Sequence, residues 1–227
     1  MPLAQRMSLC LPTIRPLGGW SPRSEDTALA WWEKNTGITK EGSVLLQWND
    51  QINGDHNFSQ ADEEKTPTID SNGVVTFTGG QHLEIGTQIT FAESSQFTFG
   101  MRVDVSELGS LFADNTSTGE FLRLTSETNL RVRIGNATSH NFALPSGTWS
   151  DKKTIIVTRD ADMTVKVFHD GTQISNTVTD EGQFLIDVFG VRRIDTNPYE
   201  GTLHEAAIFT STSDQLVSDL NNYLIKI

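Results

Sequence analysis

The stretch NPYEGTLHEAAIFTSTSDQLVSDLNNYL, residues 197–224, decides the fold because its hydrophobic period changes half-way along. Its first half contains the mostly apolar run GTLHEAAIF (201–209), which predicts a buried strand. In its second half one helical face is apolar, because hydrophobic residues recur at i, i+4, i+7 and i+8, namely at Leu216, Leu220, Tyr223 and Leu224. Thr212, with Gln215 three positions later, matches a capping box at a helix start. The sequence therefore predicts a final strand followed by a short C-terminal helix.

His204 and Glu205 are the one adjacent pair of a histidine and a glutamate in the chain, and such a pair raises the question of acid–base catalysis. Retaining glycoside hydrolases need two carboxylates about 5–5.5 Å apart. Strand alternation sends His204 and Glu205 to opposite faces, and the neighbours of Glu205 on its own face are Leu203 and Ala207, which carry no carboxylate. We therefore expect no enzyme and a structural Glu205, held by a backbone hydrogen bond or by an ion pair with Arg159, Arg192 or Arg193.

Short strand candidates recur along the rest of the chain, with turn residues between them. They cover residues 43–50, 73–85, 96–105, 109–114, 120–126, 130–136, 152–160, 163–174 and 184–193. In several of them apolar and polar residues alternate, which places one face of a sheet on a core. Asp170-Gly171 is a strong signal for a tight hairpin turn. The pattern predicts an all-β sandwich that forms one domain over residues 28–227.

The bulk properties limit the classes of partner. Seventeen basic residues against 29 acidic ones give a net charge of −12, which argues against general nucleic-acid binding. The single Cys10 cannot form an internal disulfide. We expect no secretory signal, because Pro12 and Pro16 break the first apolar run and leave it too short, and no membrane span, because no segment approaches the about 20 apolar residues that a span needs.

Residues 1–27 form a predicted extended arm. Its first 24 residues contain three arginines, no acid, four prolines and the pair Gly18-Gly19, a composition that forbids a continuous helix. Its apolar residues need burial, either against the arm's own domain or against another subunit that the arm anchors to. Our candidates for partner binding are Arg6, Leu9, Leu11, Ile14, Arg15, Leu17, Trp20 and Arg23.

Three stretches together resemble the concanavalin A-like lectin/glucanase superfamily, and within it the laminin G-like domains. They are VTFTGGQHLEIG (75–86), TIIVTRDADMTVKVFHDGTQI (154–174) and the closing stretch quoted first. The resemblance implies a concanavalin A-like jelly-roll β-sandwich with an extended N-terminal arm and a short C-terminal helix. Many members of this superfamily bind calcium or carbohydrate.

A second resemblance covers residues 14–60, which are similar to the start of tailed-bacteriophage virion proteins with this fold. Trp31-Trp32-Glu33, Trp48-Asn49-Asp50 and Gly54-Asp55 stand in the matching places. It implies a non-enzymatic structural protein on the virion surface, made in the host cytoplasm. In this role the chain would be a capsid decoration, cement or fibre-head module and would form an oligomer. Its arm would anchor it to other virion proteins, of which the major capsid protein is our first candidate. The alternative is a glycan-binding adhesin that recognises a host surface polysaccharide.

Sugar binding needs aromatic rings with polar side chains beside them. Our candidates near predicted strand ends are His140, Trp149, Asn197 and Tyr199, whereas we assign Trp31, Trp32 and Trp48 to the core or to arm packing. We expect no cofactor, and the five histidines lack zinc-ligand spacing. Calcium in the loops 49–57 or 112–120 is an open alternative, and ordinary turn chemistry is the favoured interpretation of both loops.

Overall fold

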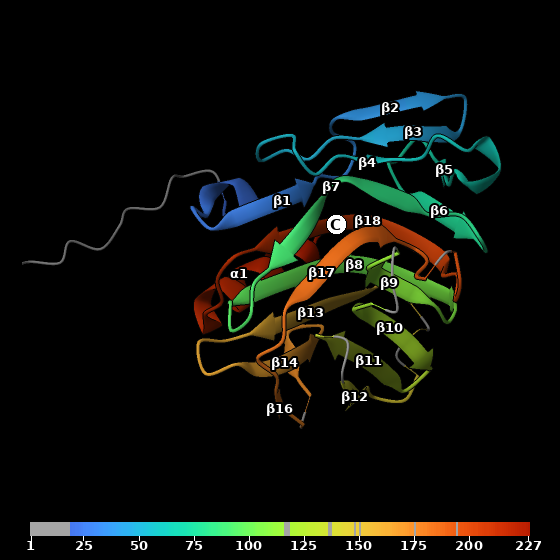
Figure 1. Ribbon diagram of the computed structural model, residues 1–227. Helices are drawn as coiled ribbons and strands as arrows, with labels where there is room; N and C mark the ends of the chain where they lie inside the picture. Colours follow the sequence, from blue (N-terminus) through green and yellow to red (C-terminus); the bar gives the residue numbers. More distant parts are fainter. Residues whose placement is uncertain are drawn as a thin grey trace, which may run out of the picture.

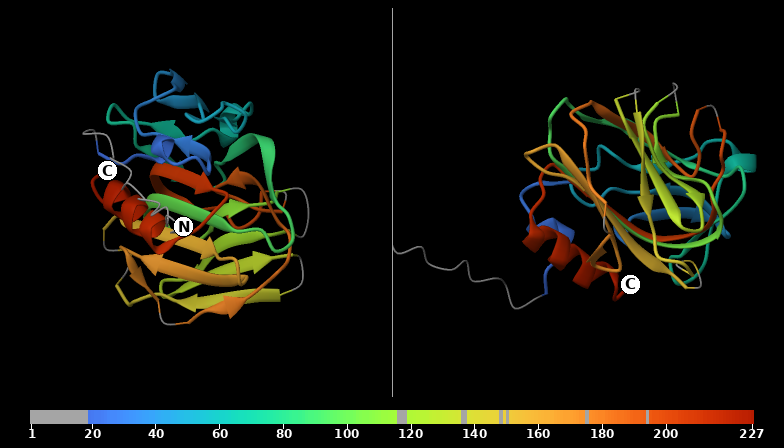
Figure 2. Two further views of the ribbon diagram at one scale, coloured as in Figure 1. Left: turned by 90° about the vertical axis from the view of Figure 1, so that its left-hand side faces the viewer. Right: turned by 90° about the horizontal axis from the view of Figure 1, so that it is seen from below.

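The chain folds into an all-β sandwich of two layers, with one helix, α1 (Asp214–Leu224), on an outer face (Figures 1 and 2). The structure is a computed structural model, and it describes residues 19–115, 119–135, 138–147, 149, 151–174, 176–193 and 195–227. The predicted all-β sandwich with a short C-terminal helix is confirmed. The arm candidates Arg6, Leu9, Leu11, Ile14, Arg15 and Leu17 lie outside the described residues.

The first sheet is antiparallel and has the closing strand near its centre. In spatial order it consists of β14 (Thr164–His169), β13 (Lys153–Arg159), β8 (Phe97–Glu107), β18 (Glu200–Phe209) and β1 (Ala28–Trp32). The first half of β18 also pairs with β6 (Val75–Thr78). Two short strands, β15 (Thr172–Gln173) and β16 (Val178–Thr179), extend β14.

The second sheet covers the inner face of the first. In spatial order it consists of β4 (Phe58–Ser59), β7 (Leu83–Phe91), β17 (Phe184–Phe189), β9 (Ser110–Ala113), β10 (Phe121–Ser126), β11 (Asn129–Ile134) and β12 (Thr138–Ala143). Three short strands bridge the two sheets at one end: β2 (Ile38–Glu41), β3 (Val44–Trp48) and β5 (Thr68–Ile69). Two 3-10 turns, η1 (Pro22–Ser24) and η2 (Glu63–Lys65), complete the fold.

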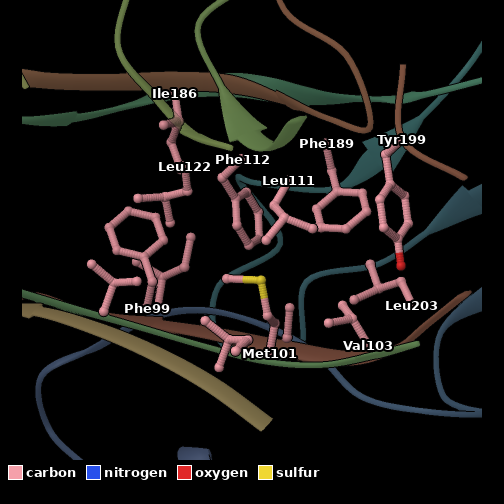
Figure 3. Close-up of a cluster of buried hydrophobic side chains, with 14 of the residues drawn as sticks. Phe99, Met101, Val103, Leu111, Phe112, Leu122, Ile186, Phe189, Tyr199 and Leu203 are labelled. Atoms are coloured by element: carbon pink, nitrogen blue, oxygen red, sulfur yellow. The ribbon is translucent and has the colours of Figure 1, made fainter. Parts of the chain in front are cut away.

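The core lies between the two sheets and follows from the alternation along the strands. Figure 3 shows Phe99, Met101 and Val103 of β8 pointing toward side chains of the opposite layer. These come from β9, β10 and β17 and include Leu111, Phe112, Leu122, Ile186 and Phe189. All of them are fully buried, so burial of apolar surface is the main stabilising contribution to the sandwich.

Helix α1 packs on the outer face of the first sheet, opposite the core. Its buried residues include Leu216, Leu220 and Leu224, as the apolar face predicted. The predicted cap was one residue early: Ser213, not Thr212, is the N-cap, and its Oγ accepts the backbone N–H of Leu216 at 3.0 Å. The backbone N–H of Thr212 instead donates to the Gln96 side chain, so Thr212 belongs to the loop.

The strand predictions fail at several places: the short strands β2, β4, β5 and β16 lie outside the predicted ranges, and two longer segments were also misjudged. The predicted strand 73–85 is two strands, because Gly79 and Gly80 both have positive φ and turn the chain between β6 and β7. Strand β12 was missed, because it is mostly polar and has one fully buried residue, Phe142. The predicted hairpin at Asp170-Gly171 is confirmed, with positive φ at both residues.

Candidate functional site

A β-bulge in β18 places His204 and Glu205 on the same face of the first sheet. Leu203 pairs with Val103 and Glu205 with Arg102, so His204 is an extra residue without a cross-strand partner. The side chain of His204 lies 3.1 Å from the Thr202 hydroxyl, on the outer face. The predicted opposite orientation of His204 and Glu205 is therefore wrong, because simple alternation does not hold through a bulge.

Glu205 is a structural carboxylate in this arrangement. It is fully buried, accepts the Trp31 indole N–H at 2.7 Å and the Lys34 backbone N–H at 3.1 Å, and is also hydrogen-bonded to the Tyr223 side chain. Burial raises its pKa, although these donors oppose the shift. The predicted backbone hydrogen bond is thus confirmed.

The three arginines proposed as ion-pair partners of Glu205 bind elsewhere. Arg159 donates to backbone carbonyls, among them those of Ser95 at 2.6 Å and Ala92 at 3.1 Å. Arg192 and Arg193 belong to a turn beside the second sheet, on the other side of the core. Trp31 and the Lys34 backbone take the place that the arginines were predicted to fill.

Two of the four glycan-binding candidates, Tyr199 and His140, have side chains that already contact other residues of the protein. Tyr199 is fully buried between Phe77 and Phe189, and its hydroxyl lies 2.6 Å from the Asp104 carbonyl oxygen (Figure 3). Tyr199 is therefore a core residue, and its prediction as a sugar contact is wrong. His140 is largely buried and lies 2.7 Å from the Asp180 carboxylate, so that its Nε2 is already bonded.

Asn197 has a backbone role in the turn before β18. Its φ is positive, and its carbonyl oxygen accepts the backbone N–H of Ser110 at 3.0 Å. Its side-chain amide is bonded to the neighbouring Thr196 hydroxyl at 3.1 Å. Nothing in this geometry brings Asn197 to Trp149, so the four predicted residues do not form one site.

Trp149 lines a cavity of about 550 Å³. The cavity lies at one end of the sandwich, and its other described lining residues are Val105, Ser106, Glu107, Leu108, Glu127 and Gly147. Trp149 is half-buried with one side against the core, and its Nε1 has no hydrogen-bond partner among the described residues. An aromatic ring beside two exposed carboxylates is an arrangement that can stack on a sugar and accept hydrogen bonds from its hydroxyls.

A second cavity of about 440 Å³ lies near the turn after β14. Its described lining residues include Leu144, Pro145, His169, Asp170 and Gln173, and no tryptophan, tyrosine or phenylalanine is among them. It therefore lacks the stacking surface of the Trp149 cavity, and it serves as a matched control.

Sequence reasoning missed a group of arginines on the outer face of the second sheet, which we call the arginine cluster. It consists of Arg123, Arg131, Arg133, Arg192 and Arg193. Burial and the four neighbouring guanidinium groups together lower the pKa of Arg192 to about 10. The alternation of arginine with apolar residues in LRVRI (130–134) was visible in the sequence. It was not visible that the turn after β17 brings two more arginines to the same face.

Two arm candidates are described, and both contact the chain's own sandwich. Trp20 packs against Phe209 and Tyr223, and its Nε1 donates to Glu25 at 2.6 Å. Arg23 donates to the Gln51 carbonyl oxygen. At these two residues the chain folds back on itself, which is one of the two alternatives for the arm.

The first of the two predicted calcium loops, residues 49–57, shows ordinary turn chemistry. The Asp50 carboxylate accepts the backbone N–H groups of Trp31, Ile52 and Gly54 at 2.9–3.2 Å. The second loop, 112–120, is described except at residues 116–118. Among the described residues, no group of three or more His, Cys, Asp or Glu side chains is arranged to hold a metal ion, and no helix is long and apolar enough to span a membrane.

No protein-family model matches the sequence, and no curated protein sequence matches it. Similar solved structures exist at low identity. The Trypanosoma rangeli sialidase in complex with 2,3-difluoro-KDN has a TM-score of 0.60 and 14% identity, over 90% of this chain and 33% of that chain. The receptor binding domain of botulinum neurotoxin D has a TM-score of 0.59 and 12% identity, over 90% of this chain and 54% of that chain. The chain thus spans about a third of the sialidase and about half of the neurotoxin domain, and the likeness shows the fold alone.

Proposed function

We propose that this chain is a non-enzymatic carbohydrate-binding module and that the Trp149 cavity is its sugar site. The observation that carries the proposal is the half-buried Trp149 ring beside the exposed carboxylates of Glu107 and Glu127, in a cavity of about 550 Å³. A preformed ring loses little conformational entropy on binding, which favours stacking against the apolar face of a sugar.

The comparison structures support the proposal by analogy. One of them concerns botulinum neurotoxin type C, whose cell entry depends on interaction with two ganglioside molecules; it has a TM-score of 0.57 and 12% identity, over 88% of this chain and 51% of that chain. Gangliosides carry glycans, so a receptor role of this kind is compatible with the fold. We place the sandwich in the concanavalin A-like lectin superfamily on the sequence resemblance, as part of the same proposal.

A glycan array probed with the full chain tests the proposal and identifies the ligand. For a glycan that binds, Trp149→Ala is expected to weaken binding at least tenfold, which corresponds to about 1.4 kcal/mol. Glu127→Gln is expected to weaken it less, because an amide still accepts a hydrogen bond. The control is Gln173→Ala in the second cavity, which should leave binding unchanged. Binding that survives Trp149→Ala and falls with Gln173→Ala would refute this assignment.

We further propose that the module works on a virus particle, as a decoration, cement or fibre-head protein. The support for this role is the resemblance of residues 14–60 to virion proteins. The contacts of Trp20 and Arg23 with the sandwich leave residues 1–18 as the segment to test for anchoring to the major capsid protein or another virion component. The same proposal includes that the chain forms an oligomer of identical copies in the particle.

A further inference from the structure

We propose that the arginine cluster is a second binding site, which takes the carboxylate or sulfate groups of an acidic polysaccharide. The outer face of the second sheet presents these arginines from two adjacent strands, β10 and β11, and from the turn after β17. This site is separate from the Trp149 cavity, since none of the arginines lines that cavity.

The two strands hold like charges directly opposite one another. Arg123 on β10 is the cross-strand partner of Arg131 on β11, and opposed like charges destabilise a sheet. Arg131 donates from its Nε to the Asn141 side chain at 2.9 Å, whereas the Nε of Arg123 finds no hydrogen-bond partner in the part of the chain that the structure describes. In the described part of the chain, no carboxylate forms an ion pair with Arg123 or Arg131. The fold therefore keeps two guanidinium groups together without neutralising them.

The turn after β17 fixes a third guanidinium on the same face. Arg192 lies over the Phe121 ring, with 4.3 Å between the guanidinium carbon and the ring centroid. The backbone of Arg192 pairs with that of Thr196 in both directions, at 2.7 and 3.0 Å. Arg192 is 7% exposed, and its Nε has no hydrogen-bond partner among the described residues.

The same turn has a strained backbone that side chains from other parts of the chain hold in place. Arg193 and Asp195 both have positive φ, a conformation that costs a non-glycine residue energy. Asp195 is anchored by an ion pair with Lys65 at 2.8 Å and by hydrogen bonds to Asn115 at 3.2 Å. These contacts keep the turn, and with it Arg192, in place beside β10.

The chemistry of arginine selects the ligand. A guanidinium is a planar fork of donors that matches a carboxylate or a sulfate with two parallel hydrogen bonds. The cluster lies on a protein of net charge −12, so a long uniform polyanion such as duplex DNA meets repulsion outside the cluster. A polysaccharide with one carboxylate or sulfate on each sugar unit spaces its charges more widely than duplex DNA does, with neutral hydroxyl groups between them.

The position of the cluster links it to the proposed sugar site, and the choice of a polysaccharide rests on that proposed function. Glu127, which lines the Trp149 cavity, belongs to the turn that joins β10 to β11. Arg123 precedes Glu127 by four residues, or roughly 13 Å along an extended strand. One polysaccharide chain can therefore contact both sites.

The test compares polygalacturonate, which carries carboxylates, and dextran sulfate with neutral dextran, by biolayer interferometry with the full chain at low and at physiological salt. We expect both acidic polymers to bind, with affinity that falls as salt rises, and neutral dextran to bind far more weakly. The double variant Arg123→Gln/Arg131→Gln should lose at least tenfold in affinity for the acidic polymers. The charge-matched control Lys40→Gln/Lys226→Gln removes two exposed positive charges elsewhere and should change affinity less than twofold. Binding of one acidic polymer alone would identify which anion the site takes.

A melting curve shows whether the arginine variants fold, and we expect the double variant to melt no lower than wild type, because it removes opposed like charges. A second double variant, Arg123→Lys/Arg131→Lys, keeps both charges and loses the planar fork, so we expect it to lose several-fold in affinity. Failure of both acidic polymers to bind, equal losses in the lysine control, or equally tight binding of a 30-base-pair DNA duplex through the same arginines would overturn the inference. If acidic polymers bind through the arginines and Trp149→Ala has no effect on any glycan, only the function proposed for the Trp149 cavity fails.

Discussion

Glu205 is a fully buried carboxylate whose donors come from β1, from the turn after β1 and from α1. Glu205→Ala would leave the Trp31 indole, the Lys34 backbone N–H and the Tyr223 hydroxyl without their acceptor. Unsatisfied buried donors cost about 1–3 kcal/mol each, so we expect a loss of about 3 kcal/mol in the free energy of unfolding. Glu205→Gln keeps an acceptor and should lose about 1 kcal/mol.

Urea unfolding of the two Glu205 variants measures these losses directly. Equal stability of Glu205→Ala and wild type would show that the hydrogen bonds contribute nothing. A polysaccharide-cleaving activity that Glu205→Gln abolishes would contradict the non-enzymatic proposal itself.

His204 gives the protein an acid-sensitive stability. It is 8% exposed, and burial, together with the nearby Lys152, Lys34 and Arg102, lowers its pKa from 6.5 to about 4, against a smaller opposing effect of Asp70. Between these two values the unfolded chain binds a proton at His204 and the folded chain does not. The stability that neutral His204 contributes is therefore complete above pH 6.5. As the pH falls from 6.5 to 4, the free energy of unfolding decreases by up to about 3 kcal/mol.

The variant His204→Gln isolates this contribution, since glutamine does not titrate. We expect the stability of wild type to fall more steeply than that of the variant between pH 6.5 and 4, in urea unfolding at a series of pH values. Parallel curves for the two proteins would contradict the lowered pKa.

At the scale of elements, the docking of α1 on the first sheet depends on a glycine. A Cβ at Gly100 of β8 would overlap the Leu220 side chain, which is fully buried beneath the helix. Gly100→Ala should therefore destabilise the fold by about 1–3 kcal/mol through overpacking, and Leu220→Ala by about 2–5 kcal/mol through the cavity that it leaves. In the double variant the new methyl group partly fills that cavity, so its loss should be smaller than the sum. Strictly additive losses in thermal unfolding would show that the two residues do not meet.

The elements differ in how far the sequence predicts them. Alternation located most strands of both sheets, because burial of one face imposes a period of two on residues such as Phe97, Phe99 and Met101. It failed at the bulge in β18, because an extra residue is defined only by the partner strand, here Val103 and Arg102 of β8. Strand β12 was missed because most of its side chains are polar and do not alternate with apolar ones.

The candidate site was predictable only in part, for a related reason. Trp149 is recognisable as a tryptophan in a polar loop, and the structure adds Glu107, from the end of β8, and Glu127, from the turn between β10 and β11. Tyr199 has the same residue type as many sugar-stacking residues but lies in the core, and burial is a property of the packed sandwich. The arginine cluster combines two neighbouring strands with a distant turn, a juxtaposition that depends on tertiary structure.

At the scale of the whole molecule, a sandwich of net charge −12 is preceded by a basic and apolar segment. Deletion of residues 1–18 keeps Trp20 and Arg23 on the sandwich, whereas a deletion to residue 24 would also remove their contacts. We expect the shorter deletion to give a folded, soluble protein that no longer joins virus particles. Mass spectrometry of purified particles assembled with the truncated chain checks this expectation, with Lys40→Gln as a full-length control. Normal incorporation of the truncated chain would contradict the anchoring role.

The central claim, that sugar binds at Trp149, is tested most directly by the indole N–H signals in a ¹H–¹⁵N NMR spectrum recorded during titration with a glycan that the array identifies. The chain has five tryptophans. Four of them donate their Nε1–H to a partner within the protein, at 2.6–2.9 Å for Trp20, Trp31, Trp32 and Trp48, whereas that of Trp149 has none among the described residues. We predict that the Trp149 signal, assigned by its loss in Trp149→Phe, shifts with the glycan while the other four stay in place. A bound glycan that leaves the Trp149 signal unmoved, or that shifts another indole instead, would contradict the claim.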